Sequence, residues 1–209
     1  QPRQMACRVY SVALAASMFN DDGGVALYTA PSAFTITTPN ATAVSAYGTY
    51  WIPNGTSTLT VATWEGTSVV PVANTFDATS GNPTFNLKIY DLTLSFKDSS
   101  GAALTTAITS YSITFPNATT TTGATASSYS QVQTGTITLT NVLWEASHVT
   151  AATNTYSLTA TGTWTMNLKI YAITPVWKDS SGAALYSSPS SFKWTAPNGT
   201  VSGALASGT

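Results

Sequence analysis

The fold is decided by the stretch Tyr90-Asp91-Leu92-Thr93-Leu94-Ser95-Phe96, in which large apolar residues alternate with polar ones. This two-residue period is that of a β-strand with one face in a core and the other in water. The stretch is followed by Asp98-Ser99-Ser100-Gly101. Because Asp can cap a turn and Gly can adopt a positive φ, a hairpin-type turn is predicted after the strand.

Outward from that strand, the same order of motifs occurs in three copies. The block from Leu27 to Thr42 recurs 77 residues later from Leu104, and again 81 residues after that from Leu185. A fixed period predicts tandem structural units. The pair Trp-Glu occurs only at 64–65 and 144–145, so the third copy has the beginning of a unit and lacks its later part.

Strand-forming residues dominate every copy, and no window shows the 3.6-residue apolar period of a helix. Short strands with turn signals at intervals of about ten residues are typical of sandwiches. We therefore predict an all-β protein made of tandem immunoglobulin-like β-sandwich domains with an incomplete C-terminal unit. The expected divisions are an N-terminal extension over 1–9, repeat 1 over 10–86, repeat 2 over 87–167, and a partial third repeat over 168–209 that another segment or subunit completes.

The composition favours a secreted protein. Only 7% of residues are charged, against about 25% in ordinary soluble proteins. Thr (39) and Ser (25) supply the polar surface in place of Lys and Glu. The net charge of -1 offers no basic patch and argues against nucleic-acid partners. Cys7 is the only cysteine, so no intramolecular disulfide is possible.

Two further expectations concern the N-terminal region. The first residue is Gln1 and not Met, from which we expect that a leader has been removed. The apolar stretch Val9 to Phe19 is shorter than the roughly 20 residues that a membrane helix needs. We expect no membrane insertion.

Four sequons of the form Asn-x-Thr are candidates for N-linked glycans, and each asparagine follows a proline. They are Asn40, Asn54, Asn117 and Asn198. Pro and Asn also form turns, so the alternative interpretation is an exposed corner without a glycan. Repetition at one place in each copy favours the glycan, which would also keep a surface with so little charge dispersed.

Other motifs favour structure over chemistry. His148 is the only histidine and has no nucleophile motif beside it, so it is interpreted as a solvent-facing residue. Asp21 and Asp22 could bind calcium, but the later copies have a single Asp among serines, which favours turn capping. The Trp-Glu pairs are either half-buried aromatic residues at strand ends or sugar-stacking platforms. We predict no enzyme activity, no metal site and no cofactor other than glycans.

The incomplete copy predicts assembly. A sandwich that lacks strands exposes sheet edges and an apolar face, and another chain can supply the missing strand. The candidate donor lies within 1–19 and has an alternating apolar series: Tyr10, Val12, Leu14 and Met18. Donation into the next subunit would be head to tail and would give a filament. The alternative is that the C-terminal strands fold back on the second domain of the same chain.

The motif order of strand, Asp-x-x-Gly turn, strand and Pro-Asn-Gly/Ala-Thr resembles the immunoglobulin-like repeats of archaeal surface proteins. The Ser/Thr-rich, sequon-bearing chain also resembles subunits of archaeal extracellular filaments, of the thread and bundling-pilus type. This resemblance implies identical subunits linked by donor strands in a helical homopolymer, displayed as a cell-surface appendage. The alternative is a cell-surface adhesin or S-layer-associated stalk that contacts sugars through exposed Trp and Tyr residues.

Overall fold

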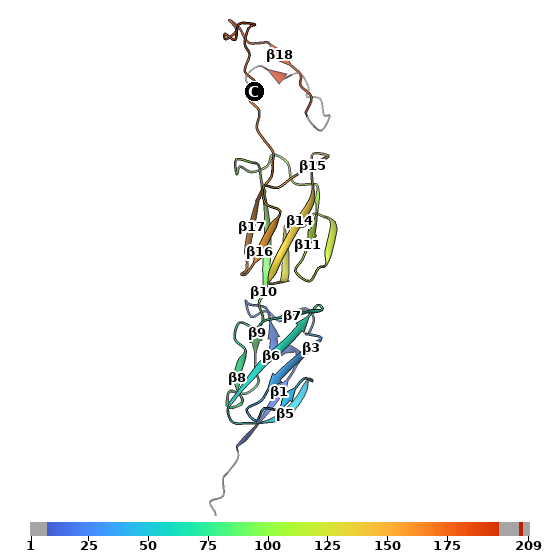
Figure 1. Cartoon of the computed structure of the whole chain (residues 1–209), viewed down its shortest axis with the longest axis vertical. Coiled ribbons are helices and arrows are strands. Elements are labelled where there is room, and N and C mark those ends of the chain that lie inside the picture. Colours follow the sequence, from blue (N-terminus) through green and yellow to red (C-terminus); the bar gives the residue numbers. More distant parts are fainter. Residues whose placement is uncertain (1–7, 197–204, 207–209) are drawn as a thin grey trace, which may run out of the picture.

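The computed structural model describes residues 8–196 and 205–206. Within these ranges the chain is built of β-strands and two three-residue 3-10 turns, η1 (Ala16–Met18) and η2 (Ala78–Ser80). This confirms the all-β fold that the alternating pattern predicts. None of the described residues forms a helix with the length and apolar character needed to span a membrane. Two sandwich domains and the third repeat follow one another along the long axis of the molecule (Figure 1).

Domain 1 is a two-layered sandwich. One layer has the strand order β4-β3-β6-β7, with β8 also pairing to β6, and the other contains the antiparallel pair β1-β5 and the parallel pair β2-β9. The strands are β1 (Val9–Leu14), β2 (Phe19–Asn20), β3 (Ala33–Thr37), β4 (Ala43–Val44), β5 (Gly48–Pro53), β6 (Thr56–Trp64), β7 (Thr67–Val69), β8 (Thr75–Asp77) and β9 (Phe85–Asn86).

Domain 2 repeats this arrangement. One layer has the order β12-β11-β14-β15, with β16 also pairing to β14, and the other has the order β13-β10-β17. The strands are β10 (Ile89–Lys97), β11 (Ser110–Thr114), β12 (Thr120–Ala124), β13 (Ser128–Gln133), β14 (Gly135–Trp144), β15 (Ser147–Val149), β16 (Thr155–Leu158) and β17 (Gly162–Asn167).

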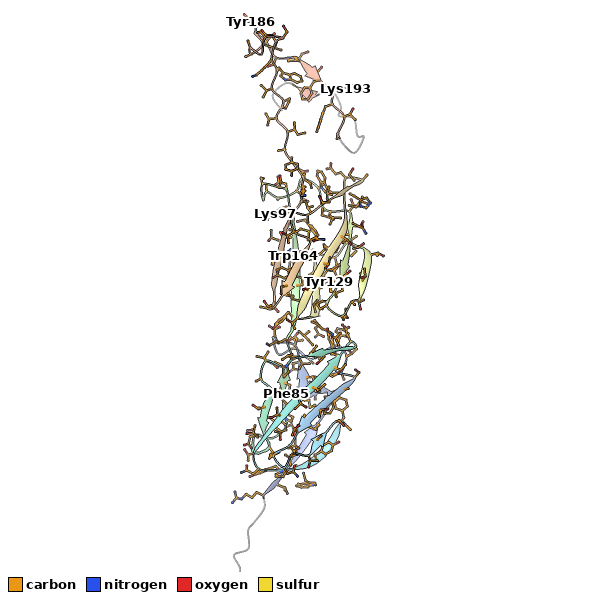
Figure 2. The ribbon with its side chains drawn as sticks, in the orientation of Figure 1. Phe85, Lys97, Tyr129, Trp164, Tyr186 and Lys193 are labelled. Carbon is orange, nitrogen blue, oxygen red and sulfur yellow. The ribbon has the colours of Figure 1, made fainter. Side chains whose placement is uncertain are left out.

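Each domain has its own hydrophobic core. The core of domain 1 extends to Ile89, and the core of domain 2 begins at Tyr90. Figure 2 shows Phe85 inside the first domain and Trp164 inside the second. Fully burying an aliphatic or aromatic side chain contributes about 1.5–3 kcal/mol, so each core can hold its sandwich together without disulfides. No flexible linker separates the two domains, because only residues 87–88 lie between β9 and β10.

The third repeat has the side chains of a core, but its described residues form no sandwich around them. Tyr171 and Ile173 are 68% and 63% exposed, whereas Tyr90 and Leu92 at the same positions of repeat 2 are buried. Pro175 stands where β10 has Leu94. Among the described residues of this repeat, the strands are β18 (Ser191–Phe192) and β19 (Leu205–Ala206), which pair with each other. Figure 2 shows Tyr186 at the far end of the molecule.

The N-terminal strand, predicted as a donor to another subunit, is paired and buried within its own domain. β1 pairs with β5 over its full length, and Val12, Leu14 and Met18 are buried in the core of their own domain, with Tyr10 packed against it. The predicted single strand also ends early, at Leu14. The turn η1 then moves the chain from its pairing with β5 to a short parallel pairing of β2 with β9.

Candidate functional site

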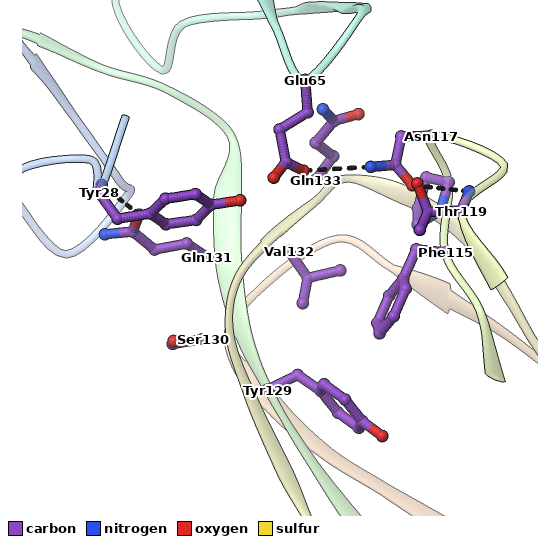
Figure 3. Close-up of a pocket in the computed structure, with 11 residues that line it drawn as sticks. Tyr28, Glu65, Phe115, Asn117, Thr119, Tyr129, Ser130, Gln131, Val132 and Gln133 are labelled. Atoms are coloured by element: carbon purple, nitrogen blue, oxygen red, sulfur yellow. Dashed lines mark hydrogen bonds between the residues drawn. The ribbon is translucent and has the colours of Figure 1, made fainter. Parts of the chain in front are cut away.

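A candidate site lies where domain 2 meets domain 1. A cleft of about 250 Å³ is lined by Tyr28 and Glu65 from domain 1 and by residues from β13 and the loop after β11 in domain 2. Figure 3 shows Glu65 above the cleft, Tyr28 on one side, and Phe115 and Asn117 on the other. Val132, which is buried, forms part of its apolar lining.

Gln133, the last residue of β13, inserts its side chain into the end of domain 1. Its Nε2 donates to the main-chain oxygen of Trp64 at 2.7 Å, and its Oε1 accepts from the hydroxyl of Thr67. Gln133 is only 5% exposed. A buried amide is tolerated only when its donors and acceptors are satisfied, so domain 1 supplies what this side chain needs.

Gln131 forms a second clamp two residues earlier. Its Oε1 accepts from the main-chain N of Tyr28 and its Nε2 donates to the main-chain oxygen of Ala26, both at 2.9 Å. One side chain of domain 2 therefore binds a donor and an acceptor of the same backbone segment in domain 1. Since main-chain atoms of a folded domain cannot rotate away, this pair of bonds fixes orientation as well as distance.

A β-bulge aims Gln131 at domain 1. The pairing of β10 with β13 shifts register between Tyr90 and Leu92, and Gln131 has a φ of 52°. A left-handed backbone costs roughly 1–2 kcal/mol for a residue other than Gly. Asp91 offsets this cost, because its Oδ1 accepts from the main-chain N of Gln131 at 3.0 Å. Domain 1 lacks the device: β1 and β5 pair without a shift, and Ser11 stands at the position of Asp91.

Asn117 and Glu65 make the third contact. Nδ2 of Asn117 donates to Oε2 of Glu65 at 3.1 Å, and its Oδ1 accepts from the main-chain N of Thr119 at 3.0 Å. Glu65 and Gly66 have φ of 48° and 77°, as in a type I′ hairpin turn, and this turn joins β6 to β7. Burial is the larger effect and raises the pKa of Glu65 above its ordinary value, and the hydrogen bond from Asn117 offsets part of this rise.

The fourth contact runs beside the chain connection. The main-chain N of Asp22 donates to the oxygen of Ile89 at 3.1 Å, and the hydroxyl of Thr161 donates to Oδ1 of Asp22 at 3.3 Å. The same hydroxyl accepts from the main-chain N of Asp91 at 3.1 Å. Domain 1 is therefore tied to both edges of the β13-β10-β17 layer of domain 2.

These contacts define an interdomain joint, which we take to comprise Gln131, Gln133, the pair Asn117–Glu65, and Asp22 with Thr161. The side-chain amides of Gln131 and Gln133, and Nδ2 of Asn117, form hydrogen bonds with domain 1. A typical net contribution is about 1 kcal/mol for each intramolecular hydrogen bond, so several together hold two domains against thermal bending.

The residues singled out by sequence lie in different places. Asn40 and Asn54 are exposed on domain 1, Asn117 is half-buried in the joint, and Asn198 lies outside the described residues. Trp64 is fully buried, and its Nε1 donates to the oxygen of Thr29 at 3.0 Å, so its ring is not a sugar platform. His148 is an exposed residue of β15.

The carboxylates of the Asp turns are occupied by the turns themselves. Oδ1 of Asp98 accepts from the N and hydroxyl of Ser100 and from the N of Ala102. Asp179 repeats all three bonds in the third repeat. In both residues the hydrogen bond from the serine hydroxyl is the main cause of a lowered pKa, followed by the backbone N–H two residues beyond that serine. This geometry accords with turn capping.

Sequence reasoning missed the two glutamines and Asp91. A signal existed, because these are positions at which the repeats differ: Gln131 and Gln133 replace Trp51 and Pro53, and Asp91 replaces Ser11. A residue that differs from its counterpart in the other copy is a candidate for a function specific to its own copy.

Comparison with known proteins leaves the family open. No protein-family model matches the chain, and no curated protein matches it. Among solved structures, one similar chain is described as the Bacillus anthracis TIE protein, with 12% sequence identity and a TM-score of 0.36. The match covers 78% of this chain and 34% of that one, so the present chain spans about a third of its length.

Proposed function

We propose that the chain is a structural subunit of a secreted extracellular filament, in which rod-shaped subunits join head to tail. The observation that supports this most is the joint, where Gln131 and Gln133 bind the main chain of domain 1. Gln133 is buried in this contact and Gln131 is half-buried, and side chains that bind one sandwich to the next are what a load-bearing rod requires. The hydroxyl-rich, weakly charged surface accords with an extracellular setting.

Strand donation is the proposed joining step, with the third repeat as the acceptor. In domain 2, β10 is flanked by β13 on one side and β17 on the other. The equivalent segment 171–177 forms no strand among the described residues, and its Tyr171 and Ile173 are exposed. Strands from a neighbouring subunit would cover these side chains and satisfy the open backbone groups, as in other strand-addition contacts.

The burial of β1 restricts its use as the donor. Removing Val12, Leu14 and Met18 from their core would forfeit about 1.5–3 kcal/mol each. β1 could therefore donate only by reciprocal exchange, in which the β1 of another subunit refills the same groove. A donor strand from elsewhere in the neighbouring subunit would avoid this cost.

Negative-stain microscopy of the purified protein tests the proposal. The wild type should form long fibres, and Ile173→Asp should give separate rods whose two domains melt as in the wild type. Val72→Asp, which places the same charge on an exposed position of domain 1, is the matched control and should still form fibres. Fibres of Ile173→Asp would reject the acceptor, and a wild type that remains as separate rods at every concentration would reject the filament.

A carbohydrate-binding stalk is the second candidate, and one observation favours it. Trp51 is 71% exposed on the outer face of the β1-β5 pair, opposite Ser11. An exposed indole face suits stacking against a sugar ring. Glycan-array binding that is lost in Trp51→Ser, with an unchanged melting temperature, would support this alternative.

A further inference from the structure

The sequons of the chain are not equivalent in the folded protein, and the joint is the reason. Asn117 is held at both ends of its amide: Oδ1 accepts from the main-chain N of Thr119, and Nδ2 donates to Glu65 of domain 1. The amide cannot flip without breaking both bonds. Any group attached to Nδ2 would enter the cleft between the domains, which measures about 250 Å³ and is already bounded by Glu65, Gln133 and Phe115 (Figure 3).

Asn40 and Asn54 have the opposite surroundings. Both side chains are exposed, and they lie on two adjoining turns at the end of domain 1 next to residue 8, which we call the proximal end. The turns are in contact, because a Cβ placed on Gly55 would lie 3.1 Å from Cβ of Pro39. Oδ1 of Asn40 accepts from the hydroxyl of Thr38 at 2.6 Å, which orients its amide without any contact to another domain.

Domain 2 has the same pair of adjoining turns, but there they lie at the interdomain joint. A Cβ on Gly135 would lie 2.8 Å from Cβ of Pro116, so the two turns pack as they do in domain 1. There the first turn carries Asn117 into the joint, and the second has Thr134 where domain 1 has Asn54. Of the three sequons within the described residues, two thus lie at the end of a domain that no described residue covers, and one lies at the docked end.

We propose that the folded protein accepts N-linked sugars at Asn40 and Asn54 and that the joint withholds Asn117 from modification. The glycans then form a paired group at the proximal end of domain 1, and the Pro-Asn-Ala-Thr motif of domain 2 serves as an interdomain tie. In the transfer, Nδ2 forms a bond to the anomeric carbon of an activated sugar. The bond from that carbon to the leaving phosphate oxygen breaks, the phosphate takes the electron pair, and one amide proton passes to solvent.

The test measures the reactivity of each sequon in the folded chain and does not depend on filament formation. Folded protein is incubated with a soluble N-glucosyltransferase and UDP-glucose, and hexose addition at each asparagine is followed over time by peptide mass spectrometry. The same chain in denatured form gives the intrinsic rate of each sequon. After division by those rates, Asn40 and Asn54 should react at least about tenfold faster than Asn117, the factor expected when a hydrogen-bonded contact must first be broken.

Two variants separate the joint from other causes. Glu65→Ala removes the acceptor of Asn117 and should raise the normalised rate at Asn117 several-fold without changing the rates at Asn40 and Asn54. Glu145→Ala makes the same change in the equivalent turn of domain 2 and should leave Asn117 unchanged. Equal normalised rates at Asn117 and Asn40 in the wild type would overturn the proposal, as would Asn40 and Asn54 reacting as slowly as Asn117.

Discussion

The amide of Asn117 donates a hydrogen bond of 3.1 Å to the carboxylate of Glu65, and this contact joins two motifs that recur separately along the chain. Glu65 follows Trp64 at the far end of domain 1, and Asn117 follows Pro116 at the near end of domain 2. The Trp-Glu and Pro-Asn motifs are therefore two sides of one interdomain contact.

Gln133→Ala should weaken the joint most. It removes two hydrogen bonds, and the main-chain oxygen of the buried Trp64 keeps only the longer bond of 3.4 Å from the hydroxyl of Thr67. Each lost bond contributes about 1 kcal/mol. Calorimetry should show domain 1 and domain 2 melting less cooperatively than in the wild type. Thr122→Ala, on an exposed position of β12, is the control, and an equal effect of both changes would contradict the role of Gln133.

Asp91→Ala should remove the support of the bulge. Without the carboxylate that accepts from its main-chain N, the strained backbone of Gln131 loses a stabilising hydrogen bond, and domain 2 should lose about 1–2 kcal/mol of stability. Backbone chemical shifts of Gln131 should move from left-handed toward extended values. Ser11→Ala changes the equivalent position of domain 1, where no bulge exists, and should have little effect.

Leu14→Ala tests where β1 resides. Leu14 is buried in the core of its own domain, so truncation should destabilise domain 1 by about 2–5 kcal/mol and leave the transition of domain 2 in place. The loss should be the same at low and high protein concentration. A loss that grows on dilution would show instead that β1 is held by another subunit.

Asp98→Ala should reduce stability in a pH-dependent way. The pKa of Asp98 in the folded chain is lowered, first by the hydroxyl of Ser100 and then by the N–H of Ala102. The stabilisation is therefore fully present above the unfolded pKa, which is about 3.9, and is lost as the pH falls through the lower folded pKa. The difference in melting temperature between wild type and variant should shrink from pH 6 to pH 2. A constant difference would show that the charge of Asp98 plays no part.

The strand alternation around Tyr90 and the Asp-x-x-Gly turns were enough to predict the fold, because a period of two residues and a capped turn are local properties. The bulge at Gln131 was not predictable in this way. It depends on Asp91, which is 40 residues away in the sequence, and on a partner domain. The break after Leu14 was missed for a similar reason, since a strand that changes its partner keeps the apolar residues of a continuous one.

The sequence alone also does not distinguish the sequons from one another. Asn40 and Asn117 lie in the same sequence motif, Pro-Asn-Ala-Thr. Only the packing of domain 2 on domain 1, which brings Asn117 to Glu65, distinguishes the docked asparagine from the exposed one. The glutamines of the joint are ordinary polar residues in the sequence. Comparing the copies position by position, rather than searching for what they share, would have identified them.

The joint should make domains 1 and 2 one rigid rod, which an electron-electron distance measurement can test. Spin labels are placed at Ala73→Cys and Thr122→Cys, both exposed, in a Cys7→Ser background. A rigid joint predicts a single narrow distance distribution that broadens in Gln131→Ala/Gln133→Ala. A broad distribution in the wild type, or one that the double variant leaves unchanged, would contradict it.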